Sequence, residues 1–399
     1  MFDRFDTEVL DEREILAYFK EENEKCFLSY IEAYDNFISP QMRSKGYEYV
    51  ARVPRTVTFC FGTITFRRRY WKRGSEKCYP VDEKLGLKKK ERYSAEMICR
   101  LAELTTIMPY RKVVKVCKLM YNISISHNLV LKARKEATRL LKKQSFIPQA
   151  KKEIDILYIE GDGLMLKTSK AGQKHVNLSH FIIHTGSEEV GKNRYQLKDK
   201  KEIISASNKK SRQLVVDYIH SRYEFHEDSL IVTNSDGGQG YTPYIFKELV
   251  KSFRTRHEHF WDSYHVHKKI TDISRGQSFE LRNLMFEALQ SHNRKLFISC
   301  LDTLESLLTS DKERDKFIDF KRNMLRNWQY TKPACLRDLG FENLTLGVIE
   351  SQHRKITYRM KGQGAYWSES GADTLSNLIL KEREEGSLRE LFYDYESEE

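Results

Sequence analysis

The stretches IDILYIEGDG (residues 154–163) and DSLIVTNSDGGQG (residues 228–240) decide the fold of this 399-residue chain. Each is an apolar run of strand length that closes at an aspartate beside glycine, which is typical of a buried strand followed by a turn. We therefore predict two buried strands that end at Asp162 and Asp236.

The segments around these strands complete an α/β pattern. Further strands are predicted at LMLKTS (164–169), HVNLSHFIIHTG (175–186) and HEHFWDSYHV (257–266), and helices at 209–223 and YTPYIFKELVKSF (241–253). The order of three strands, helix, strand, helix, strand predicts a ribonuclease-H-like sheet. The first and fourth strands are neighbours in such a sheet, so both aspartates can reach one site.

A third acid comes from a helix predicted over residues 343–361. On that helix Glu350 shares a face with His353, Arg354 and Thr357. Taken alone, this pattern favours a solvated Glu–Arg ion pair. Beside two strand-end aspartates, it also predicts a metal ligand next to groups that hold DNA phosphates.

Carboxylates from two adjacent strands and one helix suit two divalent ions that act on a phosphodiester. We expect two Mg²⁺ (or Mn²⁺) ions at Asp162, Asp236 and Glu350, because Mg²⁺ takes few protein carboxylates and keeps water and phosphate as its other ligands. Two alternatives stay open. Each Asp-Gly pair is also common turn chemistry, and Glu160 shares a strand face with Asp162 and could replace it.

A basic block follows an acidic N-terminus. The net charge is −6 over residues 1–50, +9 over 51–92 and +8 over 93–150, within a total of +12. Such a block suits a polyanion, because neutralised phosphates release counterions. A solvated basic face would give the same charge, but interleaved aromatic residues such as Phe66 and Trp71 favour nucleic acid.

Two elements of this block could contact DNA. VARVPRTVTFCFGTITFRRRYW (50–71) predicts a β-hairpin turning at Phe61-Gly62, and its second strand carries Arg67, Arg68 and Arg69. The alternative is a charged edge strand that resists aggregation. Residues 108–137 have the rhythm of a helix-turn-helix, with a break at Tyr121-Asn122 and a second helix carrying Lys132, Arg134 and Lys135.

Histidines gather after the fourth strand, at His257, His259, His265 and His267, with Asp262 among them. The spacing suggests zinc, but two H-x-H patterns without a nearby cysteine fit a strand better than a standard zinc site. Seven cysteines, an odd number without a C-x-x-C pair, indicate buried thiols in a reducing cytoplasm. No apolar run is long enough to span a membrane, and no signal peptide is expected at the acidic N-terminus.

Several segments together carry a family resemblance. They are RTVTFCFGTITFRRRYW, YIEGDG, TNSDGG, FWDSYHVHKK and the stretch from VIESQHR through RMKGQGAYWSESGA. Through them, nearly the whole chain resembles bacterial insertion-sequence DDE transposases of the ISLre type, which are related to Mutator-like transposases.

The resemblance implies metal-dependent cleavage at transposon ends and strand transfer into target DNA. It implies a catalytic triad of Asp162, Asp236 and Glu350, with Asp262 and His265 in a supporting role as an Asp-x-x-His element. Trp367 and Ser368 would match a Trp-Ser element, although a structural tryptophan that fixes the last helices is as good an interpretation.

The partners implied are double-stranded DNA, both terminal repeats and target, and a second copy of the chain in a dimer or larger assembly, in a bacterial cytoplasm at the nucleoid. Arg354, Lys355 and Arg359 could hold DNA near the site. Two rivals stay open: a catalytically silent regulator derived from a transposase, and a ribonuclease-H-like nuclease or resolvase. The segments expected are an acidic helical piece (1–49), a basic DNA-binding region (50–148), the first part of the core (149–270), an all-α insertion (271–342) and the completion of the core (343–399).

Overall fold

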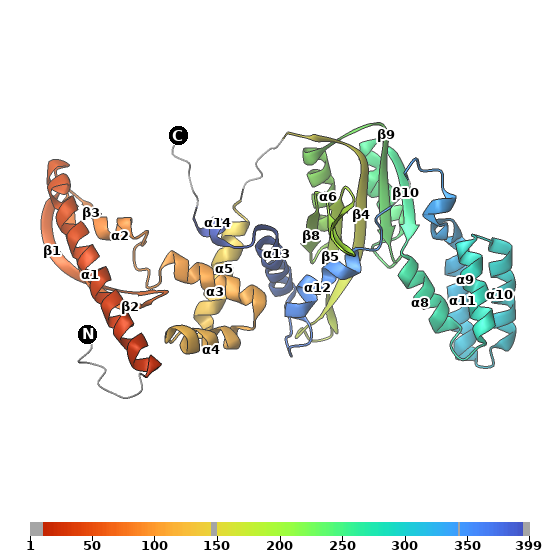
Figure 1. The fold of residues 1–399 in the computed structure, drawn as a ribbon, viewed down its shortest axis with the longest axis horizontal. Coiled ribbons are helices and arrows are strands. Elements are labelled where there is room, and N and C mark those ends of the chain that lie inside the picture. The colour runs from red at the N-terminus through yellow and green to blue at the C-terminus, as the bar shows by residue number, and fades with distance from the viewer. Residues whose placement is uncertain (1–10, 145–149, 342–343, 394–399) are drawn as a thin grey trace. The chain divides into compact units, whose positions relative to one another are not determined.

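The computed structural model describes residues 11–144, 150–341 and 344–393. It divides into two compact units: residues 1–145 with 381–399, and residues 146–380. Helix α13 (Glu369–Glu385) runs across the division (Figure 1). Residues 381–399 thus belong with the N-terminal unit, whereas the sequence had grouped them with the helix of Glu350.

The N-terminal unit pairs a long helix with a hairpin. Asp11 caps α1 by accepting a hydrogen bond from the Arg13 amide, and the hairpin strands β1 and β2 pair from Glu48 with Lys72 to Phe59 with Gly62. The predicted hairpin is confirmed, and its turn consists of Cys60 and Phe61, one residue earlier than predicted. The elements are α1 (Glu12–Ser44), β1 (Glu48–Phe59), β2 (Gly62–Arg73), β3 (Glu76–Cys78) and α2 (Pro80–Lys84).

Three further helices complete this unit, with a short α14. Asn122 ends α4 in the left-handed conformation (φ 50°), and the Ser126 hydroxyl caps α5 by accepting from the Leu129 amide. The predicted break and second helix are therefore present. The bounds are α3 (Ala95–Ile107), α4 (Tyr110–Tyr121), α5 (His127–Leu141) and α14 (Arg389–Phe392).

The second unit is built on a five-stranded mixed sheet with the order β10-β9-β4-β5-β8. Strands β4, β9 and β10 are parallel to one another, whereas β5 is antiparallel to both β4 and β8. The mixed α/β class is confirmed. The strands are β4 (Lys152–Lys167), β5 (His175–His184), β8 (Lys201–Ser205), β9 (Tyr223–Ser235) and β10 (Arg256–Trp261), and β6 (Ser187–Gly191) pairs with β7 (Arg194–Leu197) as a separate ribbon.

Three details of this sheet differ from the prediction. LMLKTS is no separate strand, because Leu164 to Lys167 continue β4 in register with β5. The third strand is instead β8, whose five residues are too short to give a clear alternation. The last strand ends at Trp261, because Asp262 caps a helix that begins at Ser263.

Helices cover both faces of the sheet (Figure 1). Leu157 and Ile159 of β4 pack with α6 and α7 on one face, while Leu164 and Leu166 pack with α12 and α13 on the other. Alternation along β4 places Glu160 and Asp162 on the same face as Leu164, and therefore on the side of α12. The helices are α6 (Asn208–Arg222), α7 (Pro243–Val250) with the 3₁₀ turn η2 (Lys251–Phe253), and α12 (Ile349–Met360).

The stretch between β10 and α12 is helical, as predicted, and has its own apolar core around Met285, Phe297 and Phe317. Helix α12 begins at Ile349, later than predicted, and Asn343 lies outside the described residues. Among the described residues, no helix combines the length and apolar character that a bilayer crossing needs. The remaining elements are α8 (Ser263–Ile273), α9 (Phe279–Gln290), α10 (Arg294–Leu307), α11 (Asp311–Arg326), η3 (Trp328–Thr331) and η4 (Ala334–Leu336).

Candidate metal centre

The two aspartates lie beside each other because β4 and β9 are parallel and in register. Ile156 pairs with Leu230, and Glu160 pairs with Asn234. Continued by two residues, this register sets Asp162 opposite Asp236, just beyond Ser235, where β9 ends. Asp162 itself lies inside β4 and does not end it, which corrects the prediction.

The glycine before Asp162 has a packing role. A Cβ on Gly161 would lie 2.6 Å from the Phe181 ring. After β9, Gly237 has a φ of +72°, and a Cβ there would lie 2.6 Å from the Trp261 indole. Both glycines therefore let an aromatic ring pack closely against the strand that carries a candidate acid.

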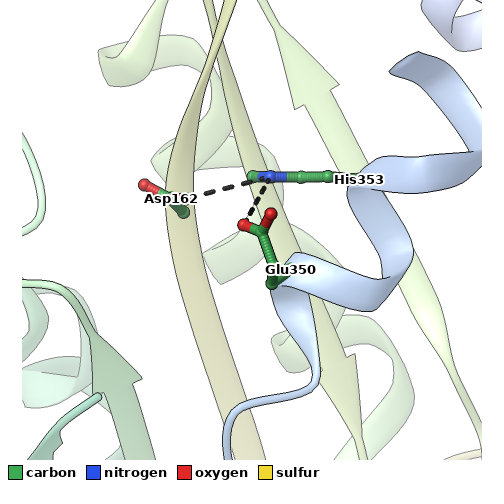
Figure 2. Close-up of side chains that lie close together, drawn as sticks. All are labelled: Asp162, Glu350 and His353. Carbon is green, nitrogen blue, oxygen red and sulfur yellow. Dashed lines mark ion pairs between the residues drawn. The ribbon is translucent and has the colours of Figure 1, made fainter. Parts of the chain in front are cut away.

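Helix α12 brings two side chains to Asp162. The Nδ1 atom of His353 lies 3.8 Å from Oδ2 of Asp162 and 3.8 Å from Oε2 of Glu350 (Figure 2). One potential ligand atom from each of the three residues lies within 4.8 Å of the others. Asp236 is outside this three-donor group, and its Oδ1 accepts a hydrogen bond of 2.7 Å from the Gly238 amide.

Burial sets the electrostatics of two of the donors, Asp162 and His353. Burial, with help from the charges of Asp236 and Glu350, raises the pKa of Asp162 to about 6. Burial lowers the pKa of His353 to about 3, so its imidazole is neutral at pH 7. The two 3.8 Å separations are therefore contacts of a neutral ring with carboxylates and not ion pairs.

The three donors fit a divalent cation. Metal–ligand bonds of about 2.1 Å place neighbouring donors about 3 Å apart and opposite donors about 4.2 Å apart. The separations of 3.8 Å lie between these values, so small side-chain rotations suffice. A neutral imidazole has a free lone pair for a metal, and Glu350 is exposed enough to turn.

Glu160, the alternative first acid, has a different task. Its side chain is fully buried, and its Oε2 accepts a hydrogen bond of 3.0 Å from the Ile349 amide at the start of α12. Burial raises the pKa of Glu160 to about 7. Glu160 therefore anchors the first turn of the helix that carries Glu350 and His353, and it is a positioning residue.

The Asp262–His265 pair is present as predicted. Oδ1 of Asp262 accepts hydrogen bonds of 2.9 Å from both the amide and the Nδ1 of His265. Burial alone would raise the pKa of Asp262, but these hydrogen bonds outweigh burial and lower it; the same carboxylate raises the pKa of His265. The charges of Asp236 and Asp162 also raise the pKa of His265, so this ring lies near the candidate centre.

The other histidines do not converge as a zinc site. His257 and His259 lie on β10 and share the hydroxyl of Thr233 at 2.8 Å each. His267 lies on α8, where its Nδ1 bonds to the Ser263 carbonyl. The H-x-H pairs therefore fall on a strand and a helix, and only the first pair fits the predicted strand.

Trp367 has the structural role that the sequence left open. Its indole N–H donates to the Met360 carbonyl at 3.0 Å, and its amide donates to the Lys167 carbonyl at 2.9 Å. The ring packs in the core beside Ile356. Trp367 therefore ties the end of α12 to β4.

Several predicted DNA-contacting residues are engaged inside the protein. Arg68 is buried, and its guanidinium binds Asp82 at 2.8 and 3.0 Å. Arg359 is also buried, above the Trp367 ring. The prediction that Arg68 and Arg359 present their charge to DNA is therefore wrong, because both guanidinium groups hold secondary-structure elements together.

The remaining basic residues divide by exposure. Arg69 binds Asp35 at 3.2 Å and Lys355 binds Glu202 at 2.7 Å, so their charges are partly balanced. Arg134 is half-buried. The fully exposed members of the predicted set are Arg67, Lys132, Lys135 and Arg354.

The N-terminal unit also has a basic cleft that the sequence reasoning missed. Its volume is about 600 Å³, and it lies between helix α5, which contributes Lys132, and the segment that precedes α3. The signal was available in the run KLGLKKKER (84–92), but only as net charge. The basic residues of the cleft are Lys88, Lys89, Lys90, Arg92 and Lys132.

Comparisons with known proteins identify relatives along nearly the whole chain. A model of the uncharacterised protein family UPF0236 matches residues 6–394. A UPF0236 protein in the vanSb 3′ region of Streptococcus gallolyticus is 30% identical over 384 residues, which cover 96% of this chain and 84% of that protein. A UPF0236 protein of Caldanaerobacter subterraneus subsp. tengcongensis, whose name joins several locus designations, is 24% identical over 389 residues, which cover 95% of this chain and 79% of that protein.

A solved structure, the simian T-cell lymphotropic virus intasome in complex with PP2A regulatory subunit B56 gamma, aligns with 62% of this chain and 80% of its own chain at 12% identity. Its TM-score of 0.16 is too low to support a common fold. The family match and the relatives agree over more than nine-tenths of the sequence. The chain belongs to the uncharacterised protein family UPF0236.

Proposed function

We propose that this protein is a DDE transposase of the ISLre type, which cleaves DNA at the ends of its element and joins them to target DNA. The observation that carries the proposal is the meeting of Asp162 on β4 with Glu350 on α12, next to Asp236 at the end of the parallel neighbour β9. The mixed sheet, with β4 between antiparallel β5 and parallel β9, supports the proposal of a ribonuclease-H-like core.

Two further observations support DNA as the substrate. The N-terminal unit carries helices α3, α4 and α5 in sequence, with a basic cleft beside α5, which supports a DNA-binding role for this unit. In addition, the names of Caldanaerobacter relatives join several loci of one genome. Closely similar copies at several loci are what a mobile element leaves behind.

The proposed reaction has two steps at one site. Water attacks a phosphodiester at the element end and releases a 3′-hydroxyl, which then attacks target DNA. Bound divalent cations, Mg²⁺ or Mn²⁺, would stabilise the charge that develops on the attacking and leaving oxygens. Asp162, Asp236 and Glu350 would hold them, and Glu160 keeps α12 in place.

The assembly and the location follow from the substrate. Two ends must be held together for joining, so we propose a dimer or larger assembly on DNA, at the bacterial nucleoid. Arg354, which is exposed one residue after His353, is suited to contact a phosphate near the centre.

The test is cleavage and strand transfer on labelled DNA that carries the element ends, with Mg²⁺ or Mn²⁺. We expect activity in the wild type and its loss, with DNA binding retained, in Asp162→Asn, Asp236→Asn and Glu350→Gln. Glu153→Gln, an exposed acid on the same strand as Asp162, is the matched control and should stay active. Binding to the ends without metal-dependent chemistry in the wild type would instead indicate a regulator, and cutting without joining would indicate a nuclease or resolvase.

A further inference from the structure

His353 is a buried imidazole without an ordinary structural partner. Its side chain is 5% exposed, and its Nε2 has no hydrogen-bond partner in the part of the chain that the structure describes. Its Nδ1 points to the space between Asp162 and Glu350, at 3.8 Å from each, beyond hydrogen-bond distance (Figure 2). Burying a polar group without a partner costs free energy, so the position needs a reason.

The surroundings of the ring hold it in this orientation. His180 stacks on it with a centroid distance of 5.2 Å and an angle of 27°. Beyond His180 lies the Glu202 carboxylate, which Lys355 and Lys200 bind at 2.7 and 2.9 Å. The stacked ring limits rotation of His353, and the two lysines keep the charge of Glu202 balanced away from the centre.

The helix supplies the rest of the geometry. Glu350 and His353 are three residues apart on α12, so they project from one face, and the Glu160 carboxylate anchors the turn on which Glu350 stands. Asp162 approaches from the strand. Two carboxylates and one imidazole therefore converge from two rigid elements, which is a preformed ligand set.

Resting on the proposed function, we propose that His353 is a metal ligand through Nδ1 and that the centre prefers Mn²⁺ to Mg²⁺. Mg²⁺ takes oxygen ligands almost exclusively, whereas imidazole suits transition metals. A set of two carboxylates and one imidazole therefore shifts selectivity toward Mn²⁺. His265 lies outside the three-donor group, and its Nδ1 is bound to Asp262.

The experiment measures metal binding directly, without activity. Full-length protein is titrated with Mn²⁺ and followed by electron paramagnetic resonance, and pulsed measurements detect nitrogen coupled to the bound ion. We expect one coupled imidazole nitrogen, whose frequencies change when the protein is labelled with ¹⁵N-histidine. In His353→Gln the coupling should disappear and Mn²⁺ affinity should fall about 10-fold or more, with a smaller change for Mg²⁺.

His265→Gln is the matched control, because it removes a neighbouring imidazole that the proposal leaves uncoordinated, and it should keep the coupling. Mn²⁺ bound without any nitrogen coupling, or coupling lost in His265→Gln but kept in His353→Gln, would overturn the proposal. The ¹⁵N comparison uses wild-type protein only, so it shows whether any histidine binds the ion even if a variant does not fold. Persistence of the coupling in folded His265→Gln then leaves His353 as the ligand at this centre. Unchanged Mn²⁺ binding in Asp162→Asn would also overturn the proposal. The proposed function fails separately, if the wild type binds Mn²⁺ through the histidine nitrogen but neither cuts nor joins DNA.

Discussion

Replacement of Glu160 tests how the sheet positions the catalytic helix. Its buried carboxylate accepts the Ile349 amide at 3.0 Å. In Glu160→Ala this amide loses its partner, and a hydrogen bond to a charged group contributes about 1.5–3 kcal/mol. We expect a loss of about 2–3 kcal/mol in the stability of the second unit and a looser first turn of α12.

The variant Glu160→Gln removes the ionisable carboxyl group and keeps the size and shape of the side chain. The pKa of Glu160 is raised from 4.5 to about 7 in the folded protein, so the folded state holds this proton more tightly than the unfolded state. The contribution of this proton to the free energy of unfolding is fully present below pH 4.5 and is lost as the pH rises through 7. At about 1.4 kcal/mol per pKa unit, the stability of the wild type relative to Glu160→Gln should fall by about 2–3 kcal/mol between pH 5 and pH 8.

Urea unfolding at several pH values measures this difference. Three of the four tryptophans (Trp261, Trp328 and Trp367) lie in the second unit, so fluorescence in a Trp71→Phe background follows that unit. The control Glu153→Gln should show a difference that does not change with pH and stays within about 0.5 kcal/mol. A pH-independent difference for the buried glutamate, or one that grows with pH, would refute the reasoning.

Three further predictions concern the centre and the N-terminal unit. Burial raises the pKa of Asp162 to about 6, so protons compete with the cation for this carboxylate at low pH. Calorimetry should therefore show that Mn²⁺ affinity falls as the pH drops below 6 and that Mn²⁺ binding releases protons. Asp162→Asn should show neither effect. Arg68→Ala should lower the stability of the N-terminal unit by about 2–3 kcal/mol in thermal unfolding. The loss is smaller than for an Asp82 left without any cationic partner, because Arg55 still binds Asp82. An unchanged melting curve would contradict this prediction. Lys132→Ala should weaken DNA binding in a salt titration and reduce the slope of log affinity against log salt by about 1, with stability unchanged, and an unaltered slope would remove Lys132 from the interface.

The reliable parts of the sequence prediction rest on local patterns. The apolar runs before Asp162 and Asp236, the β-hairpin of residues 50–71 and the helix break at Tyr121-Asn122 are each set within a short stretch of sequence, and the structure has all of them. The strand β8 was missed because its five residues carry too little alternation. The helix of Glu350 starts later than predicted, because its start depends on the hydrogen bond that the Ile349 amide donates to Glu160 and not on a local cap.

Charge was the least certain guide to function. Arg67, Arg68 and Arg69 are adjacent in sequence, yet Arg67 is exposed, Arg68 is buried on Asp82, and Arg69 binds an acid of α1. Alternation along β2 sends neighbouring side chains to opposite faces, and only the packing of α1 and α2 decides which face is covered.

By itself, the sequence determined the α/β class, the two strands that carry the aspartates, and the all-α stretch before Glu350, because hydrophobic periodicity reports which side of an element is buried. Only the tertiary structure decided that Glu160 anchors α12 and that His353 joins Asp162 and Glu350. It also decided that Asp236 lies outside the group of these three donors. These contacts join residues far apart in the chain. They depend on strand register and on the angle at which a helix packs on the sheet, and no local sequence pattern predicts either of these.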